Sequence, residues 1–359
     1  MPRHAPPHFF LSMLELRTLA WDQVPWDELD RFADRQVFQT REWLEFVAES
    51  QNGTPVVAEL RNDGALVGYF SGVLIRKLGL RILGSPFPGW TTPYIGFNLL
   101  PGTITRSQAT EALRHWAFGE MGCFHFEVMD WQFLHERTGT EGLGWELSPT
   151  YISDLTLAEE ELLARMKKTC RWSIRKAERA GVTIERATDM GFADEYYAQL
   201  TEVFARQGLK PTYSVNRVRA LLRHLLPTGR LLLLRACNPE GRSIATGIYP
   251  GFNQWATFWG NASWRSEQHW QPNEALHWYA LRYWKQQGVK HFEWGGSSGR
   301  GYYKEKFGGV PASVPSFSGS KYRALALARN GARDFFYQSR KILGMLRGFS
   351  QQPAPVSGE

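Results

Sequence analysis

The chain has 359 residues, 43% of them hydrophobic, a formal net charge of +7 and three cysteines. This length and apolar content exclude a small disulfide-stabilised domain and predict about two globular domains. The positive charge favours polyanionic partners such as nucleic acid, a nucleotide-linked substrate or an anionic membrane surface, although solubility alone would also account for it.

The N-terminal region has no convincing signal-peptide core, and no run approaches the roughly eighteen apolar residues of a membrane span. Cys123, Cys170 and Cys237 are odd in number and far apart, which argues against a disulfide framework and a Cys-x-x-Cys metal site. The nine histidines form no obvious cluster with cysteine or carboxylate. We therefore expect a cytoplasmic protein without a metal site.

Two stretches of the chain contain the same elements in the same order. Residues 56–75 and 231–252 each have the strand, glycine-containing turn, strand pattern of a hairpin. Each is followed by a segment that begins Glu-Ala-Leu, at Glu111 and Glu274, and ends in Gly-x-x-His-Phe-Glu, at 122–127 and 288–293. A hairpin followed by a helix and a further strand predicts a mixed α/β sheet covered by helices.

This repeat predicts two α/β domains of similar fold. We place the first at residues 1–150 and the second, which carries the active site, at 151–319. A C-terminal helix at 320–348 is expected to pack back on the first domain, and residues 349–359 have the composition of a disordered tail.

The segment that joins the two repeats, residues 153–189, has the pattern of one long helix that stops at Gly181. One stripe of this helix is largely apolar and comprises Leu162, Met166, Cys170, Ser173 and Ala177. A neighbouring stripe is basic and comprises Lys168, Arg171, Arg175 and Arg179. The basic stripe could contact the phosphates of RNA or of a nucleotide sugar, or it could be a solvated face.

The glycine-rich stretch GGSSGRGYYKEKFGG, residues 295–309, follows a predicted strand. Its Gly-x-Ser-x-Gly match does not indicate a serine hydrolase, because no helix follows and no histidine lies beyond His291. It also lacks the Lys-Ser/Thr ending of a nucleotide-binding P-loop. Two alternatives remain: an exposed turn, or an active-site loop in which Lys304 or Lys306 supplies positive charge.

With these residues assembled, the chain resembles the GNAT-like aminoacyltransferases of the FemABX type and the related BioF2-like acyltransferase domain. The similar segments are TCRWSIRKAERAGVTIE at 169–185, PNEALHWYALRYWKQQGVKHFEWGG at 272–296 and GRGYYKEKFGG at 299–309. The resemblance implies tandem GNAT-like domains, and no heptad insertion suggests the coiled-coil arm of some members. It also implies transfer of an amino acid from aminoacyl-tRNA to an amine of a peptidoglycan precursor or similar cell-envelope acceptor.

The resemblance assigns roles to several residues. Lys304 matches the lysine of the family's Lys-Glu-x-Phe-Gly motif and is expected to stabilise the oxyanion or the leaving 3′-oxygen. Glu293 is a candidate general base, with the substrate itself or water as the alternatives. The expected substrate-binding aromatics are Tyr302, Tyr303 and Phe307, which would lie near the terminal adenine or the acceptor. Lys306 is a further expected substrate-binding residue. Arg41, Arg171 and Arg175 are expected to contact phosphate.

The expected donor depends on the segment QHWQPNEAL, 268–276. Ordinary GNAT enzymes hold the pyrophosphate of acyl-CoA with a Q/R-x-x-G-x-G/A loop at this place, and neither glycine is present here. We therefore expect aminoacyl-tRNA as donor, with no bound cofactor, and an amine-bearing peptide or nucleotide-linked envelope precursor as acceptor. Peripheral membrane contact is an open option, and no DNA partner is expected.

Two other functions stay open. One is an acyl-CoA-dependent N-acyltransferase of envelope polysaccharide, lipid or natural-product assembly. The other is a non-catalytic GNAT-like scaffold that binds RNA or a nucleotide sugar through the basic stripe.

Overall fold

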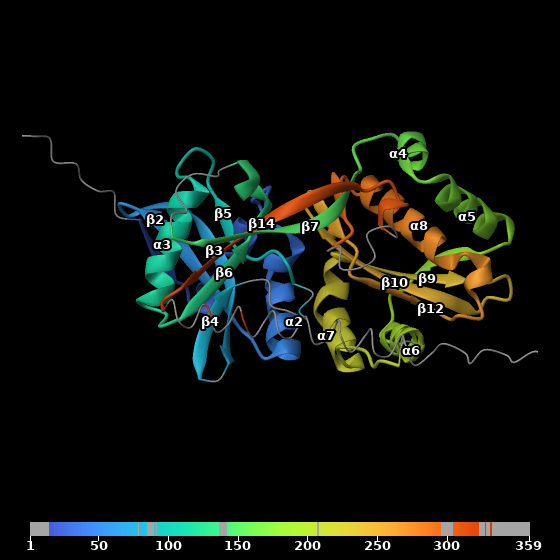
Figure 1. Ribbon diagram of the computed structural model, residues 1–359, viewed down its shortest axis with the longest axis horizontal. Helices are drawn as coiled ribbons and strands as arrows, with labels where there is room; N and C mark the ends of the chain where they lie inside the picture. Colours follow the sequence, from blue (N-terminus) through green and yellow to red (C-terminus); the bar gives the residue numbers. More distant parts are fainter. Residues whose placement is uncertain are drawn as a thin grey trace, which may run out of the picture.

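The computed structural model describes residues 14–77, 79–84, 90, 92–135, 142–206, 208–295, 304–322, 327 and 331. Within them the chain forms a large mixed sheet that runs through two halves lying side by side, with helices packed on it (Figure 1). The strands follow the order β1-β2-β3-β4-β6-β14-β7-β13-β11-β10-β9-β8, with β5 beside β3 and β12 beside β10. The predicted mixed α/β class is confirmed.

The first half contains β1 (Leu14–Thr18), α1 (Trp26–Leu29), α2 (Arg41–Gln51), β2 (Thr54–Asn62), β3 (Ala65–Lys77), β4 (Leu80–Gly84), β5 (Phe97–Leu99), α3 (Arg106–Phe118) and β6 (His125–Met129). The second half contains α4 (Glu159–Arg165), α5 (Lys168–Arg179), β8 (Thr183–Arg186), α6 (Phe192–Ala205), α7 (Val215–Leu225), β9 (Leu231–Cys237), β10 (Ser243–Phe252), β11 (Trp255–Thr257), β12 (Gly260–Ser263), α8 (Pro272–Gln286) and β13 (His291–Glu293). Two long strands, β7 (Gly144–Asp154) and β14 (Val310–Ser320), lie between the halves.

The repeat seen in the sequence is a repeat of structure. In the first half the hairpin β2–β3 leads to β4, which pairs in parallel with β6. In the second half the hairpin β9–β10 leads to β11, which pairs in parallel with β13. Gly122, just before β6, and Gly288, just before β13, both have a left-handed backbone, with φ of 59° and 80°. Glycine adopts this backbone at a lower steric cost than any other residue, because it has no Cβ.

The two halves exchange their last strands. β7 follows the first half in the chain but pairs with β13 of the second half, whereas β14 follows the second half and pairs with β6 of the first. β7 and β14 also pair with each other from Val310↔Ile152 to Ser318↔Gly144. The boundary predicted between residues 150 and 151 lies inside β7, and the domain division stays a prediction. Almost all of the expected helix at 320–348, and the whole tail at 349–359, lie outside the described residues.

The predicted single helix after β7 is wrong, because the chain forms two helices with a break at Met166 and Lys167, both of which are extended. The break is stabilised by contacts that a continuous helix could not make. The Lys167 N–H donates to the Lys306 carbonyl at 3.0 Å, and the Arg171 guanidinium donates to the carbonyls of Ala164 and Met166. The predicted apolar stripe is confirmed, since all five of its residues are buried.

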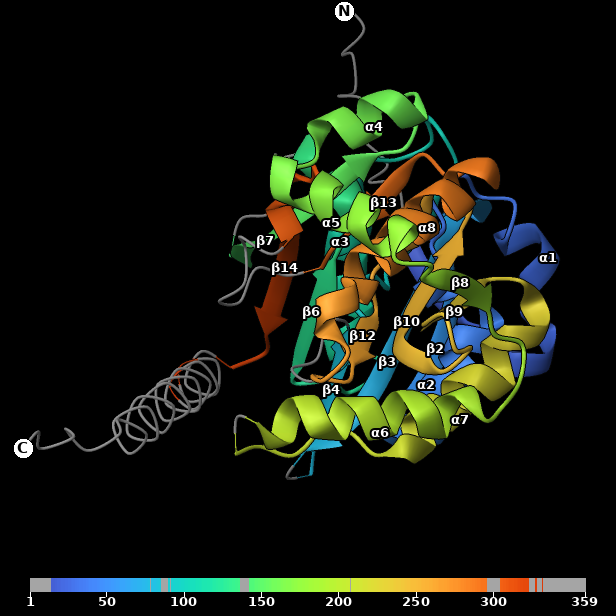
Figure 2. The same ribbon diagram turned by 90° about the vertical axis from the view of Figure 1, so that its right-hand side faces the viewer.

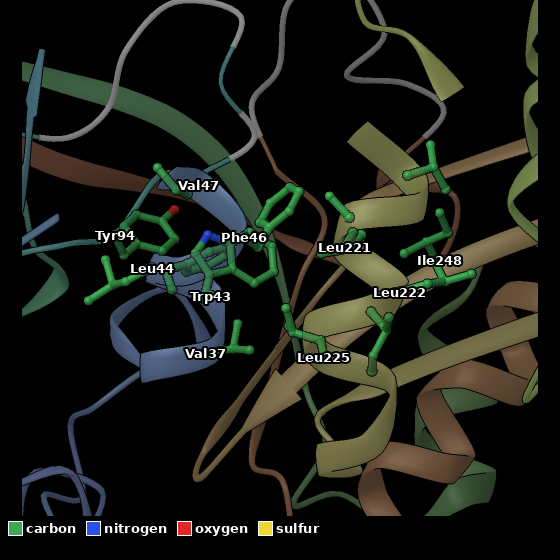
Figure 3. Close-up of a cluster of buried hydrophobic side chains, with 14 of the residues drawn as sticks. Val37, Trp43, Leu44, Phe46, Val47, Tyr94, Leu221, Leu222, Leu225 and Ile248 are labelled. Atoms are coloured by element: carbon green, nitrogen blue, oxygen red, sulfur yellow. The ribbon is translucent and has the colours of Figure 1, made fainter. Parts of the chain in front are cut away.

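Helices cover both sides of the second-half sheet. Figure 2 shows α5 and α8 on one side of β9 and β10, and α6 and α7 on the other. α2 of the first half packs against α7 of the second, and both belong to one buried cluster in which Trp43, Leu44 and Phe46 lie near Leu221, Leu222 and Leu225 (Figure 3). Each fully buried side chain of this kind stabilises the fold by about 2 kcal/mol. The halves therefore share one core, so residues of both can line a common site.

Among the described residues, no helix combines the length and apolar character needed to cross a bilayer.

Candidate active site

A cavity opens where the second-half sheet divides. β11 stays paired with β13 as far as Thr257↔Glu293, after which the Phe258 N–H donates to the Glu293 carbonyl and the Trp259 N–H donates to Ile248 of β10. The strand thus leaves β13 and continues as β12 beside β10. The cavity has a volume of about 330 Å³ and takes its walls from both halves. Its lining residues are Phe38, Trp90, Pro93, Tyr94, Met129, Ser148, Pro149, Thr150, Thr257, Phe258, Trp259, Glu293, Gly295 and Val314.

Glu293 is the carboxylate of this cavity. Its side chain accepts hydrogen bonds from the hydroxyl of Tyr94 in the first half and from Oγ1 of Thr150 in β7, the latter at 2.9 Å. Burial raises the pKa of Glu293 to about 7, even though the two hydroxyl donors and the Lys304 cation act to lower it. A carboxylate with such a pKa can accept a proton near neutral pH, as a general base must.

Glu127 holds the same position of the repeat in the first half. It pairs with Gly84 of β4, just as Glu293 pairs with Thr257 of β11. Glu127 is partly exposed, and it is not among the described residues that line the cavity. The repeated His-Phe-Glu sequence therefore provides a strand in both halves but a buried cavity carboxylate in the second.

Lys304 supplies positive charge to the same site. Its Nζ donates to the carbonyl of Gly295, a cavity residue, at 2.7 Å. Partial burial lowers the pKa of Lys304 to about 8, and the attraction of Glu293 opposes this. The structure thus brings together the two residues that the sequence predicted as catalytic, with an electrostatic interaction between them.

Lys306 and Phe307 hold the segment that carries Lys304. Lys306 forms an ion pair with Glu274 in the first turn of α8. The Phe307 ring is 1% exposed and stacks on Trp294 with 4.8 Å between the ring centroids. Neither residue is among the described residues that line the cavity. Tyr302 and Tyr303, predicted to bind substrate, lie outside the described residues.

The three arginines predicted to contact phosphate lie elsewhere. Arg41 is exposed at the start of α2, where its Nε donates to Glu45 at 2.9 Å. Arg171 caps the end of α4 through the carbonyls of Ala164 and Met166. Arg175 is exposed on α5. Their contact with phosphate stays a prediction.

Several cavity residues could not be predicted as site residues. Tyr94 lies 199 positions before Glu293 in the chain, and no local pattern connects the two. Thr150 reaches the site through the strand exchange. For Phe258 and Trp259 the sequence holds one weak signal of a site, because the two aromatic residues directly follow a short strand of the repeated unit.

We expect Tyr94→Phe to shift the acidic limb of the pH–rate profile to higher pH. The Tyr94 hydroxyl lowers the pKa of Glu293, so its removal raises that pKa and leaves less carboxylate ionised at pH 7. One lost hydrogen bond of this kind predicts a decrease in kcat/KM at pH 7 of about five- to tenfold. A parallel loss of rate at all pH values, with no shift of the limb, would contradict this role.

Comparison with known proteins bears on this geometry. Residues 164–305 match the family described as acetyltransferase (GNAT) domain. The matched range begins just before the break between α4 and α5, includes α8 and β13, and reaches Lys304. The matched range thus contains both predicted catalytic residues. None of the curated proteins matches the sequence significantly.

Solved structures have a similar fold over most of the chain. FemX is similar with a TM-score of 0.71 and 13% identity, over 88% of this chain and 99% of FemX. A tandem GNAT protein from the clavulanic acid biosynthesis pathway has a TM-score of 0.51 and 13% identity, over 86% of this chain and 98% of that protein. L-PGS from Bacillus licheniformis has a TM-score of 0.51 and 13% identity, over 81% of this chain and 94% of L-PGS. The FemABX-like tandem GNAT fold implied by the sequence resemblance is confirmed.

Proposed function

We propose that the chain transfers an amino acid from an aminoacyl-tRNA to an amine of a peptidoglycan precursor or a similar peptide acceptor. The observation that carries this proposal is a buried carboxylate, Glu293, that lines a cavity between the halves, with the partly buried ammonium of Lys304 bound to the carbonyl of Gly295 in the same cavity. These are the two groups that acyl transfer from an ester to an amine requires: a base for the amine and a cation for the developing oxyanion.

In the proposed reaction the acceptor nitrogen attacks the ester carbonyl of the donor. A C–N bond forms, the C–O bond to the 3′-oxygen of the tRNA breaks, and one proton moves from the nitrogen to the departing oxygen. Glu293 accepts this proton and returns it to the leaving group. Lys304 stabilises the negative charge, first on the carbonyl oxygen and then on the 3′-oxygen. Its effect is strengthened because the site is partly shielded from water.

The start of α8 favours a donor other than acyl-CoA. A pyrophosphate binds at a helix N-terminus through backbone N–H groups and the positive end of the helix dipole. Here Pro272 has no N–H to offer, and the buried carboxylate of Glu274 lies in the first turn, paired with Lys306. Ser173 of α5 donates to Gln271, directly before this turn. A second anion at this turn would face the Glu274 charge and the packing of α5.

The cavity offers aromatic surface for the donor. Phe38, Trp90, Phe258 and Trp259 line it beside Glu293. Base–aromatic stacking contributes about 1–3 kcal/mol per base and tolerates any base sequence. The terminal adenine of a tRNA, whose 3′-ester carries the amino acid, has the chemistry to occupy such a wall.

The transfer itself is tested with tRNA charged with radiolabelled amino acids and an amine-bearing peptide acceptor. We expect label on the peptide that survives mild base, which hydrolyses the tRNA ester but leaves an amide intact. The label should require both the charged tRNA and the chain. Labelling from acyl-CoA but not from tRNA would replace this proposal by the acyl-CoA-dependent alternative, and no transfer from either donor would favour a binding scaffold.

Ligand binding gives an independent prediction for the donor. A ligand that binds the folded state alone raises its stability by about 2.7 kcal/mol at a hundredfold excess over Kd. We therefore expect a non-hydrolysable aminoacyl-adenosine analogue to raise the Tm by about 2–4 °C, and CoA and acetyl-CoA to leave it unchanged. Stabilisation by CoA esters alone would reverse the assignment of the donor.

A further inference from the structure

The outward face of α5 carries an exposed tryptophan among cations. Trp172 is 53% exposed, and the ammonium of Lys176 lies 5.2 Å from its ring centroid. Lys168, Arg175 and Arg179 are exposed at positions one or two turns away on the same side of the helix. We call these five residues, Lys168, Trp172, Arg175, Lys176 and Arg179, the α5 basic face.

The opposite side of α5 fixes this orientation. Cys170, Ser173, Ile174 and Ala177 are buried against the second-half core, so the helix cannot turn its tryptophan inward. Among the described residues, none of the four cations of the α5 basic face is in an ion pair. In contrast, nearby Arg165 pairs with Glu161 and Lys167 pairs with Glu305. The one acid of the helix, Glu178, lies at the margin of the face, about 120° around the axis from Trp172.

We infer that the α5 basic face docks on an anionic lipid surface. Unpaired cations on an exposed helix are attracted to anionic headgroups, and tryptophan prefers the membrane–water boundary because its ring is apolar and its N–H is polar. α5 lies on the outer surface of the second half, where a flat bilayer can reach it (Figures 1 and 2).

A lipid surface explains the arrangement better than RNA does. Single-stranded nucleic acid is bound in basic grooves with successive aromatic platforms. The α5 basic face is instead one helix face with a single tryptophan at its centre.

Docking through this face would place the candidate active site close to the membrane. The N-terminal end of α5 is joined to the loop that carries Lys304 by the Lys167–Lys306 backbone hydrogen bond and the Lys167–Glu305 ion pair. An acceptor or lipid-linked amine held in the bilayer surface would then lie near Lys304. The membrane contact does not depend on the proposed function, because neither Glu293 nor Lys304 takes part in it.

The test is sedimentation of the full chain with vesicles of phosphatidylcholine, with and without about 30% phosphatidylglycerol. We expect binding to the anionic vesicles alone, weakened when salt rises from about 0.1 M to about 0.5 M. Reversing three cations in K168E/K176E/R179E should weaken binding at least about a hundredfold, because each cation contributes about fivefold near an anionic surface. Trp172→Ala should weaken it about tenfold.

Matched variants separate the α5 basic face from net charge and from exposed aromatics in general. R76E/K77E reverses two exposed cations at the end of β3, and Tyr322→Ala removes an aromatic that is 56% exposed. Both should bind vesicles nearly as the wild type does. Circular dichroism and Tm show whether each variant is folded. The inference is overturned if the wild-type chain does not bind anionic vesicles, or if the α5 variants bind as tightly as the controls do. It is also overturned if the α5 variants lose binding to tRNA while the wild-type chain ignores vesicles, since the face would then be an RNA site.

Discussion

Lys304→Ala lowers the rate of acyl transfer at least about a hundredfold without loss of the fold, because one cation aimed at a developing oxyanion contributes about that factor. The Lys304 ammonium is partly buried and lies in the field of Glu293, so water cannot replace it fully. Its removal leaves the anchors of the loop, Phe307 on Trp294 and Lys306 on Glu274, in place. We therefore expect an unchanged Tm. The measurement is single-turnover transfer from charged tRNA, together with thermal unfolding.

Two further variants make this result specific. Lys304→Arg retains a cation of different shape and should recover part of the lost rate. Lys77→Ala removes an exposed lysine at the far end of β3 and should have wild-type activity. Full activity in Lys304→Ala would show that Lys304 takes no part in the reaction.

Glu293→Gln should abolish most activity and at the same time stabilise the protein above pH 7. General base catalysis contributes about a hundredfold or more, and glutamine cannot accept the proton. The folded-state pKa of Glu293 is about 7, against an ordinary value of 4.5, so the folded state retains this proton over a pH range in which the unfolded state releases it. Wild-type stability therefore falls as pH rises from 4.5 to about 7, by about 3 kcal/mol in total. Glutamine does not ionise, so the stability of Glu293→Gln does not fall in this way as pH rises.

Urea unfolding at two pH values checks the stability effect. Glu293→Gln should exceed the wild type by about 3 kcal/mol at pH 8, and the difference should vanish near pH 4. Glu127→Gln is the matched control, because Glu127 holds the repeated position in the first half. It should not change the activity. Equal stability of Glu293→Gln and the wild type at pH 8 would show that Glu293 is not held in a buried environment.

The same two groups predict the shape of the pH–rate profile. Transfer requires Glu293 ionised and Lys304 protonated, so kcat/KM should rise as pH passes about 7 and fall as it passes about 8. The two limbs of this narrow maximum report apparent pKa values of the interacting pair, not of either residue alone. In Glu293→Gln the rising limb should disappear from the residual activity.

Local patterns in the chain were sufficient for the repeat and for the buried stripe of α4 and α5, and they placed Glu293 and Lys304 among the site candidates. The hairpins, the two left-handed glycines before the His-Phe-Glu strands and the stripe from Leu162 to Ala177 depend on neighbours within a few residues. Backbone conformation and one-sided burial are set at that range, so their signal is present in the sequence. The resemblance then supplied the role of Lys304.

Contacts between distant segments were decided by the tertiary structure alone. The break at Met166 and Lys167 depends on a carbonyl of Lys306, and Phe307 is buried because Trp294 and His277 surround it. The exchange of β7 and β14 brings Thr150 to Glu293, and the packing of the halves brings Tyr94 there. A glutamate in His-Phe-Glu is therefore a partly exposed strand residue at 127 and a buried carboxylate at 293. The repeated sequence is the same at both places, and the desolvation that raises the pKa comes from residues far away in the chain.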